Sequence, residues 1–276
     1  MQRLSLDSAR IGVLVNPSGE CDPQLAVLDA WAREHGHTVV DLGTSARPNA
    51  GDSDCELIVA LGGDGTILRA LQLAMVGHAA VLGVNFGHVG FLADVSGSEL
   101  AGALAAVARG EGAIAERTAL VTTIPGQPPH RVIAFNDVVV NRQPGYGAAR
   151  LRVEVGDESL FELRGDGVVI ASPTGSTAYT VGAGGPAVAP SLDAIVLTPL
   201  AAQGSPLRSL VIDGGDALRV VVEPSSAPLT VEIDGRTIDG MPEPGTLEIH
   251  AAPRKARLVR TRPRTFYRDL ADQVLS

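Results

Sequence analysis

Apolar runs that alternate with helical periods organise the first part of the chain. Four runs are continuous and rich in β-branched residues: Ile11–Val15, Thr38–Leu42, Leu57–Leu61 and Ala79–Val84. Runs of this length and character are typical of buried parallel strands. Helical spacing follows Asp22-Pro23, which we expect to be an N-cap and a proline at the first helical position, and returns at Ile67–Met75. Ser96–Glu99 has the form of a capping box and predicts a helix through Arg109. This order predicts a doubly wound parallel sheet in an α/β domain.

The pattern changes after Gly110 to short β-rich runs separated by turn residues. Runs such as Leu229–Ile233 alternate apolar with polar residues, which is typical of antiparallel strands with one wet face. Eleven runs are predicted as strands, at or around Leu120–Ile124, Arg131–Val140, Leu151–Val155, Leu160–Leu163, Val168–Ala171, Ile195–Thr198, Leu210–Ile212, Ala217–Val222, Leu229–Ile233, Thr246–His250 and Ala256–Val259. We therefore expect an α/β domain over residues 1–100 and an all-β, sandwich-like domain over 101–261. The segment 262–276 returns to helical spacing and is expected to pack back on the first domain.

Composition narrows the class of protein. The chain has 276 residues, of which 45% are hydrophobic and 19% charged, as in soluble globular proteins. The net charge of −9 argues against nucleic acid or an anionic membrane as a partner. Cys21 and Cys55 lack metal-ligand spacing and are expected to be plain thiols. No apolar run approaches the roughly 20 residues of a membrane helix, and the first ten residues lack the apolar core of a signal peptide, so we expect a cytoplasmic protein.

The segment Gly62–Thr66, GGDGT, joins a predicted strand to a predicted helix. Such a turn directs backbone N–H groups and the positive end of a helix at one point, which suits a phosphate. Asp64 would repel that phosphate unless it acts in the chemistry, either by taking a proton from an attacking hydroxyl or by helping to hold Mg²⁺. The alternative is a tight turn in which Asp64 and Thr66 only cap the helix.

Two further segments carry polar groups between apolar runs. Asn136-Asp137 lies between predicted strand residues, where it either contacts a ligand such as a purine or ribose or forms an Asx turn. Arg164–Gly167 precedes a strand, and Ser172–Pro186 then supplies hydroxyls, glycines and Tyr179, a ring that can stack on a base. Long loops in compact domains are usually functional, so we favour a ligand-binding loop over a merely connecting one.

Four segments in order resemble the NAD kinase family: LGGDGT at Leu61–Thr66, LGVNFGHVGFL at Leu82–Leu92, ND at Asn136-Asp137 and RGDGVVIASPTGSTAYTVGAGGP at Arg164–Pro186. The first is shared with diacylglycerol and sphingosine kinases and, in close form, with phosphofructokinases, whereas the last is highly specific. The resemblance implies an N-terminal α/β domain, a C-terminal β domain and a homodimer or homotetramer. It also implies transfer of a phosphoryl group from ATP, carried with Mg²⁺, to the adenosine 2′-hydroxyl of NAD, which makes NADP.

The resemblance also implies roles for individual residues. Asp64 is the expected catalytic base. The residues expected to bind NAD are Asp64, Gly65, Asn136, Asp137, Arg164, Asp166, Thr177, Ala178, Tyr179, Thr180, Val181 and Gly182. The residues expected to meet the phosphates of ATP are Gly62, Gly63, Thr66 and Arg69. No dedicated metal ligands are expected, since Mg²⁺ would arrive held by ATP oxygens and water.

Two segments depart from the family pattern. Residues 199–207 replace a Pro-His-Ser-Leu-Ser-like segment, and Asp234-Gly235-Arg236 replaces a frequent Asp-Gly-Gln. Ala201 and Arg236 are therefore expected to contact NAD or a neighbouring subunit. Two other functions stay open: a lipid kinase of the diacylglycerol type that shares the GGDGT turn, and a non-catalytic protein that senses NAD(P).

Overall fold

The computed structural model describes residues 3–4, 6, 9–18, 21–48, 54–87, 90–93, 95–124, 130–204, 207–238, 245–262 and 265–274. The chain forms two compact units, Met1–Arg117 with Lys255–Ser276, and Thr118–Arg254. We call them the α/β unit and the β unit. The sequence analysis had placed these boundaries after residues 100 and 261.

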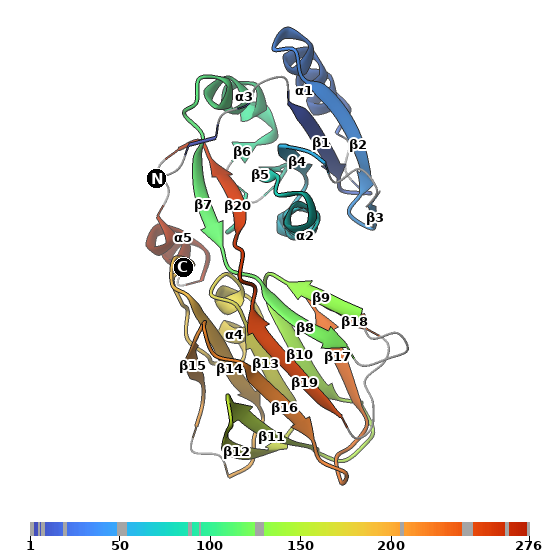
Figure 1. Ribbon diagram of the computed structural model, residues 1–276, viewed down its shortest axis with the longest axis vertical. Coiled ribbons are helices and arrows are strands. Elements are labelled where there is room, and N and C mark those ends of the chain that lie inside the picture. The colour runs from blue at the N-terminus through green and yellow to red at the C-terminus, as the bar shows by residue number, and fades with distance from the viewer. Residues whose placement is uncertain are drawn as a thin grey trace. The chain divides into compact units, whose positions relative to one another are not determined.

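A mostly parallel sheet forms the centre of the α/β unit (Figure 1). Its strands are β1 (Arg10–Val15), β2 (Thr38–Thr44), β3 (Arg47–Pro48), β4 (Leu57–Leu61), β5 (Ala80–Asn85), β6 (Val95–Ser96), β7 (Ala113–Arg117) and β20 (Ala256–Arg260). The order is β3-β2-β1-β4-β5-β20-β7, with β6 beside β5. Strands β3 and β7 are antiparallel to their neighbours, and the other pairings are parallel. The predicted α/β fold with a parallel sheet is confirmed.

Helices cover both faces of this sheet. They are α1 (Asp22–Glu34), α2 (Asp64–Gly77) and α3 (Leu100–Ala108, entered through the 3₁₀ turn Gly97–Glu99). A further helix of this unit is α5 (Phe266–Gln273). Side chains alternate between the faces of a strand. Leu28 of α1 and Leu104 of α3 share one core with Val59 and its same-face neighbours. Helix α2 packs on the other face, so closely that a Cβ on Gly83 of β5 would overlap with Ile67.

The two predicted helix starts have different outcomes. The capping box is confirmed, since Ser96 and Glu99 bond each other's side chain and backbone. The N-cap prediction at Asp22 is wrong. Cys21 is the N-cap residue, Asp22 is the first helical residue, and Pro23 therefore comes one position later than expected. Both positions belong to the first turn, where a proline costs no hydrogen bond.

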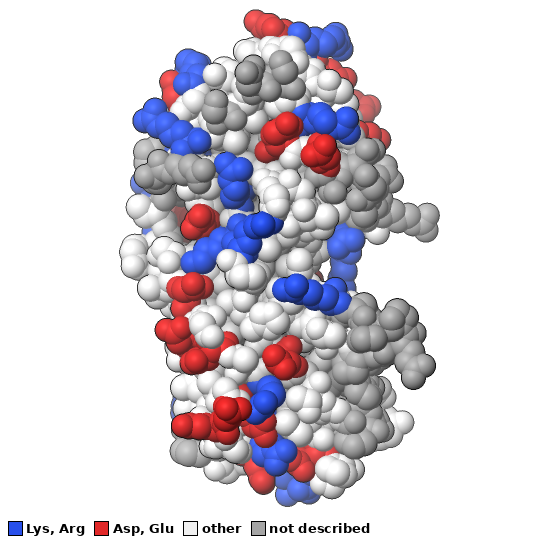
Figure 2. Space-filling view, viewed as in Figure 1, with Lys and Arg blue, Asp and Glu red and all other residues white. Residues whose placement is uncertain are grey.

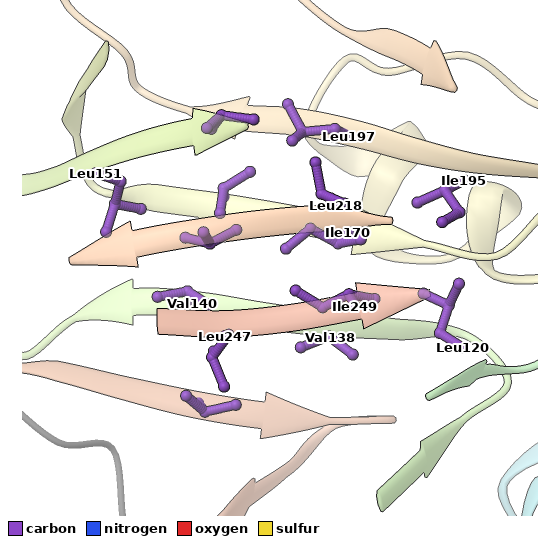
Figure 3. Close-up of a cluster of buried hydrophobic side chains, with 14 of the residues drawn as sticks. Leu120, Val138, Val140, Leu151, Ile170, Ile195, Leu197, Leu218, Leu247 and Ile249 are labelled. Atoms are coloured by element: carbon purple, nitrogen blue, oxygen red, sulfur yellow. The ribbon is translucent and has the colours of Figure 1, made fainter. Parts of the chain in front are cut away.

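The β unit is a sandwich of two antiparallel sheets, as predicted. One has the order β15-β14-β13-β10-β17-β18 and the other β12-β11-β16-β19-β8-β9. The strands are β8 (Leu120–Ile124), β9 (His130–Ala134), β10 (Asp137–Arg142), β11 (Ala149–Val155), β12 (Glu158–Gly165), β13 (Gly167–Ala171), β14 (Ala194–Leu200), β15 (Leu210–Asp213), β16 (Leu218–Val222), β17 (Leu229–Ile233), β18 (Arg236–Ile238) and β19 (Thr246–Ala251). Inward-facing residues of both sheets, such as Val138, Ile170, Leu218 and Ile249, form one buried core (Figure 3).

Two strand predictions are wrong in an informative way. The run Arg131–Val140 is not one strand, because β9 pairs with β8 in one sheet and β10 pairs with β13 and β17 in the other. The chain therefore crosses between sheets at Phe135-Asn136. The run Ala256–Val259, expected in the β-rich half, forms β20 and pairs parallel to β5 in the sheet of the α/β unit.

The sequence contains both acidic and basic residues, and the surface carries charges of both signs. Acidic and basic side chains both occur over the face drawn in Figure 2. Within the described ranges, no helix combines the length and the apolar character that crossing a membrane requires.

Candidate functional site

The GGDGT turn follows β4 at the carboxyl end of the parallel sheet. The N–H of Gly62 donates to the carbonyl of Val84 at the end of β5 (2.8 Å), which fixes the turn to the neighbouring strand. A Cβ on Gly62 would overlap with the side chain of Thr66, so this position requires glycine. Ligands of parallel α/β sheets bind at this end of the strands.

Helix α2 begins at Asp64, with Gly63 as its N-cap and no side-chain cap. The alternative that Asp64 and Thr66 only cap the helix is therefore wrong. Gly65 is exposed, Asp64 is half-buried and Thr66 is buried. Arg69, one turn further along the helix, donates to the side chain of Gln72 (2.7 Å).

The carboxylate of Asp64 is held by backbone groups of the segment that follows β5. The N–H of Phe91 donates to Oδ2 (2.9 Å) and the N–H of Leu92 donates to Oδ1 (3.3 Å). Gly90 lies against the carboxylate, and a Cβ there would overlap with it. Each carboxylate oxygen has a second lone pair, so Asp64 is oriented and can still accept a further proton or hydrogen bond. His88 and Val89 of the same motif lie outside the described residues.

In the β unit, Asn136 and Asp137 lie where the chain crosses from β9 to β10. The carboxylate of Asp234 accepts the N–H groups of Phe135 (3.0 Å), Asn136 (2.7 Å) and Asp137 (3.2 Å). Asp234 and Gly235 both have positive φ, 48° and 75°, as in a type I′ hairpin turn between β17 and β18. The alternative of an Asx turn therefore names the wrong acid. The acceptor of the N–H groups of residues 135–137 is Asp234, which belongs to a hairpin distant in the sequence.

The start of the Ser172–Pro186 loop docks against the same crossing. The N–H of Ser172 donates to the carbonyl of Asn136 (2.9 Å), and its hydroxyl donates to the carbonyl of Phe135. The N–H of Gly175 donates to the Ser172 hydroxyl (3.1 Å), and a Cβ on Gly175 would overlap with the Asn136 backbone. The structure therefore brings Asn136, Asp137 and this loop together.

The rest of the loop is ordered by short helical turns, a 3₁₀ turn at Gly175–Thr177 and α4 at Tyr179–Gly182. Ser176 donates to the carbonyl of Pro173 (2.7 Å) and accepts the N–H of Val188 (2.8 Å), which ties the loop together. The six loop residues expected to bind NAD, Thr177–Gly182, differ in exposure. Ala178, Tyr179 and Gly182 are exposed, Thr177 and Val181 are half-buried, and Thr180 is fully buried. The side chain of Thr180 therefore faces the protein interior.

Arg164 and Asp166 lie at the other end of β13, which spans the five residues Gly167–Ala171. At about 3.3 Å per residue this is a distance of roughly 17 Å from the Asn136 crossing. Both are exposed, and Asp166 forms an ion pair with Arg142 (2.6 Å). Ala201, with φ of 47°, follows β14 at this end of the sheet. Arg236, in contrast, is exposed beside the Asp234 turn, at the Asn136 end.

Electrostatics distinguish Asp137 from the other carboxylates. Asp137 is 6% exposed, and burial raises its pKa from the ordinary 3.8 to about 7, with the charges of Asp234 and Glu232 adding to the shift. A carboxyl with such a pKa carries a proton for part of the time at neutral pH, so it can donate as well as accept. Within the part of the chain that the structure describes, no three His, Cys, Asp or Glu side chains group as metal ligands.

Three structural contributors to these sites are not predicted from the sequence. Asp234 was noted but given no role, although Asp-Gly between two alternating runs indicates a hairpin. The N–H groups of Phe91 and Leu92 could not be anticipated, because backbone direction leaves no signal in composition. Arg260, which donates to the carbonyl of Phe91 (3.0 Å), belongs to a strand that had been assigned to the other half of the chain.

Both halves of the chain match models of known families. Residues 13–112 match the ATP-NAD kinase N-terminal domain, and residues 135–261 match the ATP-NAD kinase C-terminal domain. The NAD kinase of Heliobacterium modesticaldum is 37% identical over 240 residues, covering 86% of this chain and 85% of that protein. The NAD kinase of Desulforamulus reducens is 30% identical over 279 residues, covering 96% of each.

Two solved structures share the fold. Yeast NADH kinase, solved as a complex with NADH, superposes with a TM-score of 0.84 at 20% identity, covering 99% of this chain and 88% of that one. An NAD kinase from Archaeoglobus fulgidus, solved with ATP, superposes with a TM-score of 0.76 at 23% identity, covering 95% and 98%. At these identities the likeness concerns the fold.

Proposed function

The chain belongs to the NAD kinase family, and from this premise we propose that it transfers the terminal phosphoryl group of ATP to the adenosine 2′-hydroxyl of NAD, with Asp64 as the base. The lipid-kinase alternative is not favoured, because the similarity extends through the β unit as well as the GGDGT turn. A purely NAD(P)-sensing protein is not favoured either, because the curated relatives are named as kinases.

The orientation of Asp64 is the observation that carries the catalytic assignment. Two backbone N–H groups aim its carboxylate, and it stands at the first position of α2. As the 2′-oxygen forms its bond to phosphorus, the bond from phosphorus to the bridging oxygen of ADP breaks, and Asp64 takes the hydroxyl proton. Phosphoryl transfer depends mainly on positioning and charge neutralisation, so a base that is held in place contributes roughly 10² to 10⁴ in rate.

ATP phosphates are proposed to meet the first turn of α2. Gly62, Gly63 and Thr66 supply a tight turn and the positive end of a helix, which favours anions. Arg69 is the proposed cation on the next turn. Mg²⁺ belongs to the ATP complex in this proposal, held by phosphate oxygens and water.

NAD is proposed to bind the β unit. Asn136 and Asp137 are the proposed contacts of adenine and ribose, and Gly65 is a proposed contact from the α/β unit. Thr177–Gly182 line the pocket through their exposed residues and backbone, with Thr180 contributing backbone only because its side chain is buried. Arg164 and Asp166, at the far end of β13, stay proposed contacts of the pyrophosphate and ribose. We further propose a homodimer or homotetramer with Ala201 or Arg236 at a subunit or NAD contact, and a cytoplasmic location.

The test replaces Asp64 by Asn and follows NADP through a coupled glucose-6-phosphate dehydrogenase assay with NAD, ATP and Mg²⁺. We expect kcat to fall roughly 10²- to 10⁴-fold while calorimetry shows NAD bound with unchanged affinity. Asp22→Asn is the matched control, because Asp22 is likewise the acid at the first position of a helix and shares the helix-dipole effect. Equal losses in the two variants would contradict the base assignment, and a wild-type protein that forms no NADP would contradict the function itself.

A further inference from the structure

Three adjacent parallel strands converge on Asp64. Strand β4 leads into the turn that carries Asp64, β5 leads into the segment whose Phe91 and Leu92 bind its carboxylate, and β20 ends at Arg260. Because β20 runs parallel to β5, all three strands deliver these residues at the same end of the sheet. Arg260 is 169 positions from Phe91 in the sequence, and its Nη2 donates to the Phe91 carbonyl at 3.0 Å.

The peptide unit between Phe91 and Leu92 connects the two charged groups. A trans peptide is planar, and its C=O and N–H point in opposite directions. Arg260 binds the C=O on one side, and Asp64 accepts the N–H of Leu92 on the other (3.3 Å). A cation on the carbonyl fixes the plane of this peptide and polarises it, which strengthens the N–H as a donor.

A second arginine, Arg117, lies near enough to Arg260 for their charges to interact. The pKa of Arg117 is lowered to about 10, first by burial and then by the positive charge of Arg260, while the charge of Asp269 acts in the opposite direction. Asp269 lies on α5 and is only 7% exposed, an unusual position for an aspartate unless it is paired. The terminal helix thus places a buried acid near enough to Arg117 to act on its charge.

We propose that Arg260 is a positioning residue for Asp64, holding the Phe91–Leu92 peptide so that its N–H orients the carboxylate. The proposal rests on the proposed role of Asp64 as base. It assigns a role in the kinase reaction to the last strand, through a residue that does not touch a substrate.

The test compares Arg260→Met in two backgrounds. In the otherwise unchanged enzyme we expect kcat to fall about 10- to 100-fold, with KM for NAD and for ATP changed less than about twofold, because orientation and not binding is lost. In Asp64→Asn the same substitution should change kcat less than about twofold, because the carboxylate that Arg260 positions is already gone. Arg260→Lys, which keeps the charge with fewer donors, should recover part of the rate.

Amide hydrogen exchange supplies a readout that does not depend on activity. We expect the N–H of Leu92 to exchange faster in Arg260→Met than in the wild type. Arg257→Met is the matched control, since Arg257 lies on the same strand and donates to another backbone carbonyl, that of His78 (3.5 Å). It should leave both kcat and Leu92 exchange unchanged.

Several results would overturn the inference. Equal losses of kcat from Arg260→Met in the two backgrounds would show a general structural role, as would a loss from Arg257→Met of the same size. If Arg260→Met does not fold, Arg260→Lys carries the same double comparison, and full wild-type kcat and Leu92 exchange in Arg260→Lys and Arg260→Gln would reject the proposal. If the single variant Asp64→Asn kept the wild-type kcat, the assignment of Asp64 as the base would be rejected instead. Failure of the positioning role of Arg260 and failure of the base assignment are therefore distinguishable.

Discussion

The two units hold their functional carboxylates in opposite ways. In the α/β unit, Asp64 stands at the end of a parallel strand, is half-buried, and receives two backbone N–H groups. In the β unit, Asp137 lies at a crossing between two sheets, is almost fully buried, and is flanked by the like charges of Asp234 and Glu232. Two N–H donors hold the carboxylate of Asp64 in place, whereas burial raises the pKa of Asp137.

This difference follows from the folds. A parallel sheet ends all its strands in loops at one edge, where free N–H groups surround whatever side chain stands there. In the sandwich, Asp137 lies where the chain changes sheets and the ladder is interrupted. There the backbone of residues 135–137 needs acceptors, and Asp234 supplies them. In the β unit, Asp234 builds the crossing, and Asp137 is the proposed ligand contact beside it.

The largest expected effect is the loss of stability on changing Asp234, which accepts the N–H groups of residues 135–137. Asp234→Ala removes the acceptor of three N–H groups, and each unpaired buried donor costs about 1–3 kcal/mol, so we expect a loss of roughly 3–9 kcal/mol in the stability of the β unit. Asp234→Asn keeps one acceptor oxygen and tolerates the positive φ of this residue, so it should lose about half as much. Urea unfolding followed by circular dichroism measures both. Equal stability of the two variants would show that the backbone at the crossing does not depend on this side chain.

The next largest effect is expected on kcat, through the position of the Asp64 carboxylate in the α/β unit. Gly90→Ala would place a methyl group against the Asp64 carboxylate and turn it from Phe91 and Leu92, so we expect kcat to fall about 100-fold with little change in unfolding midpoint. Gly87→Ala is the control, because no atom lies within 4 Å of a Cβ built there. The coupled NADP assay measures both variants. Matching rates in Gly90→Ala and the wild type would show that the carboxylate does not need this orientation.

The two units also differ in how far the sequence could predict them. Strands β4 and β5, helix α2 and the GGDGT turn followed from local patterns, because a buried parallel strand and a glycine turn are set by residues close in sequence. The alternating strands of the sandwich were equally visible. The split of Arg131–Val140 was not, because an apolar run gives no sign that its two halves pair in different sheets. The return of β20 to the first sheet was missed for the same reason, since pairing depends on contacts remote in sequence.

The candidate site residues likewise divide into those that the sequence could predict and those that it could not. Asp64, Asn136 and the Ser172–Pro186 loop stand out as polar groups beside apolar runs, and the structure brings the last two together. The partners that orient them are backbone N–H groups, a hairpin aspartate and an arginine on the last strand, none of which forms a pattern with its target. Three-dimensional proximity, and not residue type, makes these groups candidates for a function.

The smallest expected effect measures how Asp137 differs from an ordinary carboxylate. Its pKa in the folded protein is about 7 against an ordinary 3.8, so between these values the folded state binds one more proton than the unfolded state. The contribution of Asp137 to stability is therefore complete below pH 3.8 and decreases as the pH rises through about 7. From pH 6 to pH 8 the wild type should lose on the order of 1.4 kcal/mol that Asp137→Asn, which cannot ionise, does not lose. Urea midpoints at both pH values test this, and Asp213→Asn, an exposed acid of the same unit, is the control. A wild type and an Asp137→Asn variant with the same pH dependence would show that Asp137 ionises as freely as a surface acid, and the contrast between the two units would then be one of geometry alone.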